Sequence, residues 1–131
     1  MVYDILIVDD SATMRKVIIR TLKMAELPLG EILEAGSGKD ALETLQNRTV
    51  DIILADINMP EMTGIEMTEI LQADEKTKSI PVIVVSTEAS TTRIDELKQI
   101  GVKGYVHKPF TPEAIRKVVN DVLGACHVGN K

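Results

Sequence analysis

Apolar residues recur along this chain in two alternating patterns, one typical of buried strands and one typical of helices. Three short runs are continuous and rich in β-branched residues, as in strands buried on both faces of a sheet. The first run, Ile5–Val8, forms the end of the strand predicted over Tyr3–Val8. The second is Ile52–Ala55, shortly after Val50, and the third is Val82–Val85, directly after Pro81. Two weaker strands are predicted at Glu31–Ala35, at a sheet edge, and at Gly104–His107.

Between these strands, apolar residues fall at helical spacing behind residues that cap helices. In the first helix Met14, Val17, Ile18 and Leu22 form the inward stripe, which leaves the basic residues, Arg15 included, on the solvated side. In the third helix Met67, Ile70 and Leu71 are expected on one side. The expected helix starts are Ser11 or Thr13, Ser37, Thr63, about Thr91, and Thr111-Pro112. The fourth helix is predicted to end at Ile100 and the fifth at Gly124.

Strict alternation of five strands and five helices predicts an α/β fold. Right-handed crossovers place the helices on both faces of a parallel sheet, which makes a doubly wound (βα)5 domain. With 131 residues the chain is expected to be one domain over residues 1–124, followed by a short C-terminal tail over residues 125–131.

Composition narrows the function classes. A net charge of −5 disfavours nucleic acid as a partner, because binding it requires a basic surface. No apolar run is long enough to span a bilayer, and the N-terminus does not resemble a signal peptide. One cysteine, Cys126, favours a reducing compartment. These features predict a soluble cytoplasmic protein. Cys126 and His127 adjoin on the expected tail, which is a poor arrangement for a metal site.

Polar residues stand where the predicted strands end. Asp9 and Asp10 follow the first strand, Asp56 follows the third, Ser86 follows the fourth and Lys108 follows the fifth. The carboxyl ends of parallel strands share one edge of the sheet, where ligands bind in such folds.

Three carboxylates at one edge repel one another unless a cation neutralises them. A set of oxygen ligands without histidine or cysteine favours Mg²⁺. Together with a lysine and a hydroxyl, this set suits phosphoryl transfer, in which charge stabilisation and positioning supply most of the catalysis. Taken singly, each residue has an ordinary explanation, such as acids at a helix N-terminus, a turn aspartate, a capping hydroxyl or a solvated lysine. Their coincidence at successive strand ends favours a site.

Four segments, ILIVDDSATMRK, DIILADINMPEMTGIE, PVIVVSTEAS and GYVHKPF, closely resemble the receiver domains of two-component response regulators, in the same order and spacing. The end-to-end match suggests the stand-alone, CheY-like kind. The resemblance implies a flavodoxin-like sheet with strand order 2-1-3-4-5.

The resemblance also assigns roles to residues. Asp56 would accept a phosphoryl group from a sensor histidine kinase, a phosphotransfer protein or a small donor such as acetyl phosphate. Mg²⁺ would be held by Asp10, Asp56 and the backbone carbonyl of Asn58, with Asp9 acting through a water. Lys108 would pair with Asp56 and then with the phosphoryl group.

A conformational switch follows in the family pattern. Ser86 would reach toward the phosphoryl group and Tyr105 would move from outward to inward, which would remodel the face of the fourth helix, fifth strand and fifth helix for a downstream protein partner. Chemotaxis is a plausible setting, no membrane insertion is expected, and the chain is expected to be a monomer or a weak dimer.

Two rival functions remain at this point. A Mg²⁺-dependent phosphatase of the haloacid dehalogenase type also uses an aspartate nucleophile after a strand, although its two acids are spaced DxD and here they adjoin. A flavodoxin-like mononucleotide carrier is disfavoured by the acidic pocket. The receiver hypothesis predicts a signalling module whose output is binding, not turnover, and which assists its own dephosphorylation.

Overall fold

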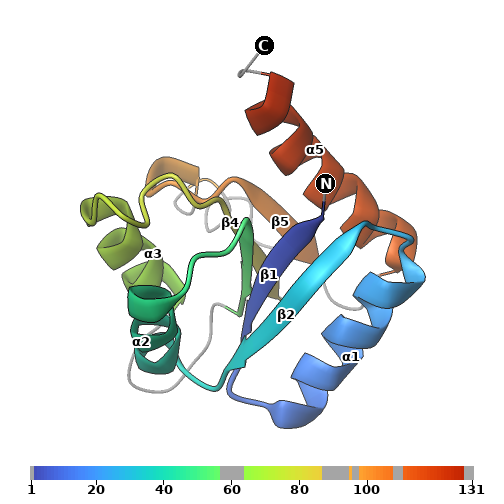
Figure 1. The fold of residues 1–131 in the computed structure, drawn as a ribbon, viewed down its shortest axis with the longest axis horizontal. Helices are drawn as coiled ribbons and strands as arrows, with labels where there is room; N and C mark the ends of the chain where they lie inside the picture. The colour runs from blue at the N-terminus through green and yellow to red at the C-terminus, as the bar shows by residue number, and fades with distance from the viewer. Residues whose placement is uncertain (1, 57–63, 87–94, 96–97, 108–110, 129–131) are drawn as a thin grey trace.

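Strands and helices alternate along the chain in the computed structural model, which describes residues 2–56, 64–86, 95, 98–107 and 111–128 (Figure 1). The strands are β1 (Tyr3–Val8), β2 (Leu29–Ala35), β3 (Ile52–Ala55), β4 (Val82–Ser86) and β5 (Gly104–His107). The helices are α1 (Ala12–Met24), α2 (Gly38–Asn47), α3 (Gly64–Ala73) and α5 (Pro112–Val128). The helix expected over 91–100 lies largely outside the described residues.

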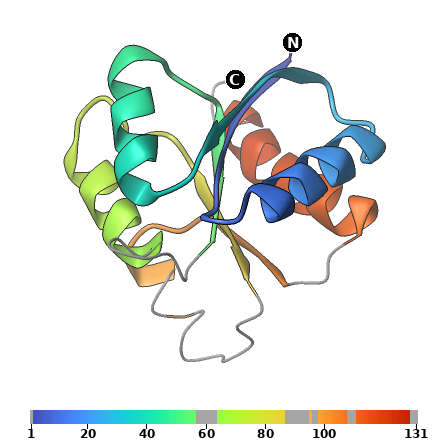
Figure 2. The same ribbon diagram turned by 90° about the horizontal axis from the view of Figure 1, so that it is seen from below.

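All five strands join one parallel sheet in the order β2-β1-β3-β4-β5. The predicted doubly wound α/β fold and its flavodoxin-like strand order are therefore confirmed, and β2 lies at an edge as expected. Helices α1 and α5 cover one face of the sheet, whereas α2 and α3 cover the other (Figure 2).

Alternate residues of the central strands feed two cores. Ile5 and Ile7 of β1 pack with α1 and α5, while Leu6 and Val8 pack with α2 and α3. Because both faces are covered, the strand has no polar face, which explains its continuous apolar run. The buried hydrophobic side chains of the described residues are aliphatic or methionine, in keeping with the scarcity of aromatic residues.

Helix starts follow the predicted caps. The hydroxyl of Ser11 accepts from the Met14 N–H at 3.2 Å, and that of Ser37 accepts from the Asp40 N–H at 3.1 Å. Thr111 caps α5 in the same way, with Pro112 as its first residue. Each hydroxyl satisfies one of the backbone donors that a helix start leaves unpaired.

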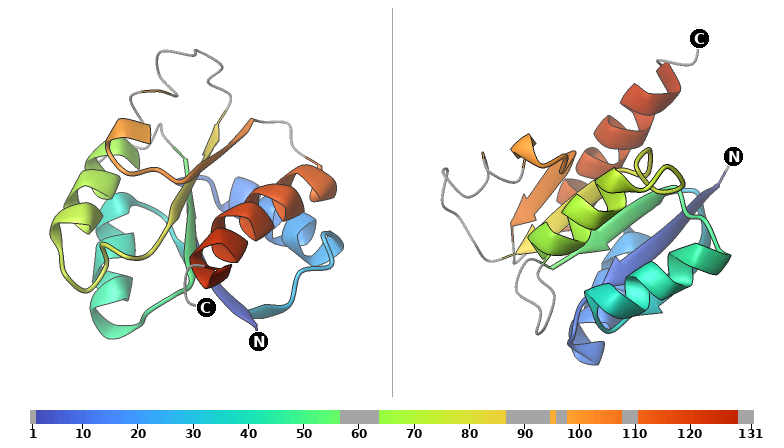
Figure 3. Two further views of the ribbon diagram at one scale, coloured as in Figure 1. Left: turned by 90° about the horizontal axis from the view of Figure 1, so that it is seen from above. Right: turned by 90° about the vertical axis from the view of Figure 1, so that its left-hand side faces the viewer.

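Two expectations about the helices are wrong. Val17 of α1, expected in the inward stripe, is 44% exposed. Ile70 of α3 is likewise 44% exposed, whereas Met67 and Leu71 of the same helix are buried. Gly124 does not end α5, which continues to Val128 and extends past the sheet (Figure 3). A glycine inside a helix costs only about 1 kcal/mol relative to alanine, and neither a proline nor another glycine follows it within the helix.

No helix in the described part of the chain combines the length and apolarity needed to cross a membrane.

Candidate functional site

Three carboxylates meet where β1 and β3 end. Val8 and Ala55 are partners in the parallel register, and the next residues are Asp9 and Asp56. The Asp56 N–H donates to the Val8 carbonyl at 3.0 Å, which extends the pairing one step past the strands. One carboxylate oxygen each from Asp9, Asp10 and Asp56 lie within 4.8 Å of one another. We call these three residues the acidic cluster.

The members of the acidic cluster differ in exposure. Asp9 is only 2% exposed, Asp56 is partly exposed and Asp10 is exposed. A buried carboxylate needs partners, because loss of its water shell is costly. Oδ1 of Asp9 accepts from the Ser11 N–H at 2.9 Å, and the Asp9 N–H donates to the Ala35 carbonyl at 3.1 Å. The cluster is thus open to solvent on the side of Asp10 and Asp56 and anchored on the side of Asp9.

Arg15 is a component of this region that the hydrophobic pattern did not reveal. It was expected on the solvated side of α1, but its side chain is only 17% exposed. Its Nη1 donates to the backbone carbonyl of Asp9 at 2.5 Å, and its Nε donates to Glu34 Oε1 at 3.0 Å. A signal was present in the sequence, because Arg15 precedes the core residues Ile18 and Leu22 by three and seven positions and so shares their side of the helix.

The remaining predicted site residues are only partly described. Ser86 is the last residue of β4, and its backbone is in register with His107, the residue before Lys108. Lys108 and Asn58 lie outside the described residues. Tyr105 lies in β5 and packs with Ile100 against Val84 and Val102. Its hydroxyl oxygen is buried, although the residue as a whole is partly exposed.

The donor set of the acidic cluster fits a hard divalent cation. It offers carboxylate oxygens alone, which suit Mg²⁺ rather than zinc or copper, and its open side leaves room for the waters that Mg²⁺ retains. Among the described residues, this is the one group of three or more potential ligands close enough to share an ion.

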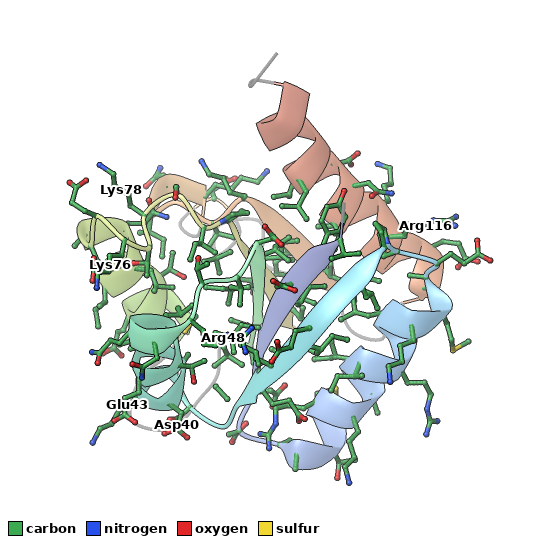
Figure 4. All side chains as sticks on the ribbon, in the orientation of Figure 1. Asp40, Glu43, Arg48, Lys76, Lys78 and Arg116 are labelled. Atoms are coloured by element: carbon green, nitrogen blue, oxygen red, sulfur yellow. The ribbon has the colours of Figure 1, made fainter. Side chains whose placement is uncertain are left out.

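A groove on the described part of the molecule lies elsewhere. Its volume is about 580 Å³, and α2, α3 and the turn after α3 line it. Lys76 and Lys78 mark that end of the molecule in Figure 4, whereas Asp40, at the start of α2, lies toward the opposite end. None of the predicted site residues that the structure describes lines this groove.

An ion pair with perturbed titration also lies apart from the acidic cluster. Both guanidinium Nη atoms of Arg48 contact the Glu31 carboxylate, at 2.6 and 2.7 Å. Hydrogen bonding to Arg48 lowers the pKa of Glu31, and the same bond raises the pKa of Arg48. Glu31 belongs to the N-terminal half of β2, so the pair anchors an edge strand and does not contribute to the site.

Comparisons with known proteins agree with this geometry. The family model for the response regulator receiver domain matches residues 5–120. The chain is 41% identical to the chemotaxis protein CheY of Pseudomonas aeruginosa over 119 residues, which cover 91% of this chain and 94% of that protein.

Solved structures give the same answer. The chemotaxis response regulator CheY4 of Vibrio cholerae superposes with a TM-score of 0.83 at 34% identity, covering 93% of this chain and 99% of that one. The receiver domain of the sensor histidine kinase PA1611 of Pseudomonas aeruginosa, described with a magnesium ion in its active-site cleft, shares the fold at a TM-score of 0.81 and 22% identity, over 95% of this chain and 99% of that one. The matched family also decides against the phosphatase and mononucleotide-carrier rivals. The chain belongs to the response regulator receiver domains, a family of phosphorylation-controlled signalling domains, and is similar to CheY.

Proposed function

We propose that Asp56 is the phosphoacceptor of this receiver domain. The carrying observation is the acidic cluster, in which a partly exposed carboxylate at the end of β3 lies beside two others at the end of β1. In the reaction, an Asp56 oxygen forms a bond to phosphorus while the bond between phosphorus and the donor imidazole nitrogen breaks. The imidazole keeps the electron pair and takes a proton.

A divalent cation belongs to the same proposal. Asp10, Asp56 and the Asn58 carbonyl would hold Mg²⁺, with Asp9 acting through a water. When bound, the ion offsets the negative charge that otherwise opposes the approach of a phosphoryl group to three carboxylates. The oxygen-only donor set supports this assignment, as does the magnesium described for the receiver domain of PA1611.

Lys108 and Ser86 complete the proposed site. Lys108 would neutralise a phosphoryl oxygen, and Ser86, at the end of β4, would donate its hydroxyl to another. Two local changes would start the switch. Lys108 would leave Asp56, and Ser86 would shift toward the phosphoryl group. The same site would then assist hydrolysis of its own phosphoaspartate.

Tyr105 would carry this change to the output surface. Its ring packs on Val84 and Val102, next to the strand that ends at Ser86. A shift of Ser86 would therefore alter the space open to Tyr105, and with it the face that the family pattern assigns to the fourth helix, β5 and α5. We assign that face to a downstream protein target, and a sensor histidine kinase or phosphotransfer protein to the donor side. The similarity to chemotaxis proteins favours chemotaxis as the setting.

NMR with beryllofluoride, a stable mimic of the phosphoryl group, tests this proposal. In the presence of Mg²⁺ we expect amide shifts at Asp56, Ser86 and Tyr105, and none of them in the Asp56→Asn variant. If shifts arise without Mg²⁺, or equally in the variant, the assignment of the site is wrong. If the shifts are confined to residues next to Asp56, the site holds but the coupling to Tyr105 fails.

A further inference from the structure

Arg15 touches the acidic cluster through the backbone and not through a carboxylate. We infer that it is a positioning residue for the divalent cation, which fixes the Asp9–Asp10 turn so that both carboxylates stay within reach of Asp56. The inference rests on the proposed function and assigns that site a residue outside its ligand set.

The bond to the Asp9 carbonyl acts on both acids at once. That carbonyl belongs to the peptide unit that joins Asp9 to Asp10, and this unit is planar. Holding its oxygen against Arg15 Nη1, at 2.5 Å, sets the torsion on either side of the unit and so the direction in which each side chain leaves the backbone. The Asp9 N–H is fixed in turn by the Ala35 carbonyl. The turn is therefore held at both ends of Asp9.

The guanidinium is itself held in place. Its Nε bonds Glu34 in β2, so a single planar group connects the start of α1, the turn after β1 and the edge strand. Arg15 is 17% exposed and Glu34 44%, so the bond is shielded mainly on the arginine side. A lysine carries a single compact charge in place of this rigid planar fork, so it cannot make both the contact with the Asp9 carbonyl and the contact with Glu34.

Electrostatics alone predicts the opposite effect. A cation near a Mg²⁺ site repels the ion, so removing that cation should tighten binding. Glu34 offsets most of this repulsion by pairing with Arg15. The sign of the change in Mg²⁺ affinity therefore separates positioning from simple charge.

The experiment is a Mg²⁺ titration of the full chain by NMR, followed at the amides of the acidic cluster, with Tm measured in EDTA. The variants are Arg15→Met, Arg15→Lys and Glu34→Gln. Arg20→Met is the matched control, because Arg20 is exposed on the same helix and the substitution removes the same charge.

We expect Arg15→Met to raise the Kd for Mg²⁺ about tenfold, as is typical when a group that orients metal ligands is lost. Arg15→Lys and Glu34→Gln should raise it less, and Arg20→Met should change it less than about twofold because an exposed, distant charge is screened. A merely structural role would lower Tm while leaving the Kd unchanged.

Unchanged or tighter Mg²⁺ binding by folded Arg15→Met would overturn the inference. If that variant does not fold, Arg15→Lys decides, since it keeps the positive charge and loses only the planar fork. Weaker Mg²⁺ binding by Arg15→Lys then supports the inference, and unchanged binding overturns it. Absence of Mg²⁺ binding by the wild-type chain would instead overturn the proposed function, and the inference with it.

Discussion

Gly104 is the position in β5 where the structure leaves no room for a side chain. A Cβ there would lie 2.9 Å from Val118 Cγ1, 3.3 Å from Ile83 Cγ1 and 3.3 Å from Val122 Cγ2. All three neighbours are β-branched, so their χ1 angles are stiff and the contacting carbon atoms cannot swing aside freely. Gly104→Ala should therefore push α5 away from β5.

The cost follows from these contacts. Overpacking a core by one methyl group costs about 1–3 kcal/mol. Alanine returns roughly 0.4–1 kcal/mol by restricting the unfolded chain. We expect a net loss of roughly 1–2 kcal/mol, and for a chain of this length each kcal/mol lowers Tm by about 4 °C.

Urea unfolding and thermal melting, both followed by circular dichroism, measure this loss. Gly36→Ala is the matched control, because its Cβ would meet only ordinary contacts, 3.6 Å from Arg15 Nη1 and 3.8 Å from Asp40 Oδ2. Its stability should stay within about 0.5 kcal/mol of wild type. Equal stabilities for the two variants would refute the claim that close packing of α5 on β5 requires glycine at position 104.

Three further predictions concern charge and backbone. Asp10→Asn should raise Tm in EDTA at low salt, because two charges within 4.8 Å of each other repel by at least about 0.9 kcal/mol in water, and Mg²⁺ should stabilise the variant less than wild type; a salt-independent effect would contradict this. Glu26 has a left-handed φ of 59°, so Glu26→Gly should raise the free energy of unfolding by roughly 0.5 kcal/mol, seen as a higher urea midpoint, and a lower midpoint would refute the strain. An NMR titration should show the pKa of Glu31 below its ordinary value of 4.5, and this pKa should rise toward 4.5 in Arg48→Met. Because folding lowers this pKa, the pair's contribution to stability is present above pH 4.5 and is lost as pH falls through the folded pKa.

The fold could be predicted because its main determinants are local. Continuous apolar runs such as Ile52–Ala55 predicted strands covered on both faces, and Ser11 and Ser37 predicted helix starts. Strand order was not local information and came from the resemblance. The end of α5 was predicted wrongly because a glycine permits a helix end without enforcing one.

The site could be predicted in part for a different reason. Parallel strands end at one edge, so chain positions alone placed Asp9 and Asp56 near each other, and the structure brings their carboxylates together with that of Asp10. The roles of Asp56, Ser86, Asn58 and Lys108 remain predictions. Arg15 was missed because hydrophobic periodicity treats any cation as solvated, whereas its bonds depend on how α1 meets β2, a tertiary feature.

The most direct test of the central claim is the intact mass of the chain after incubation with Mg²⁺ and acetyl phosphate, beside Asp56→Asn and an EDTA control. We predict the gain of one phosphoryl group that requires both Asp56 and the metal. The same gain in Asp56→Asn or in EDTA would contradict the account. So would the absence of any gain together with an unchanged NMR spectrum on addition of beryllofluoride.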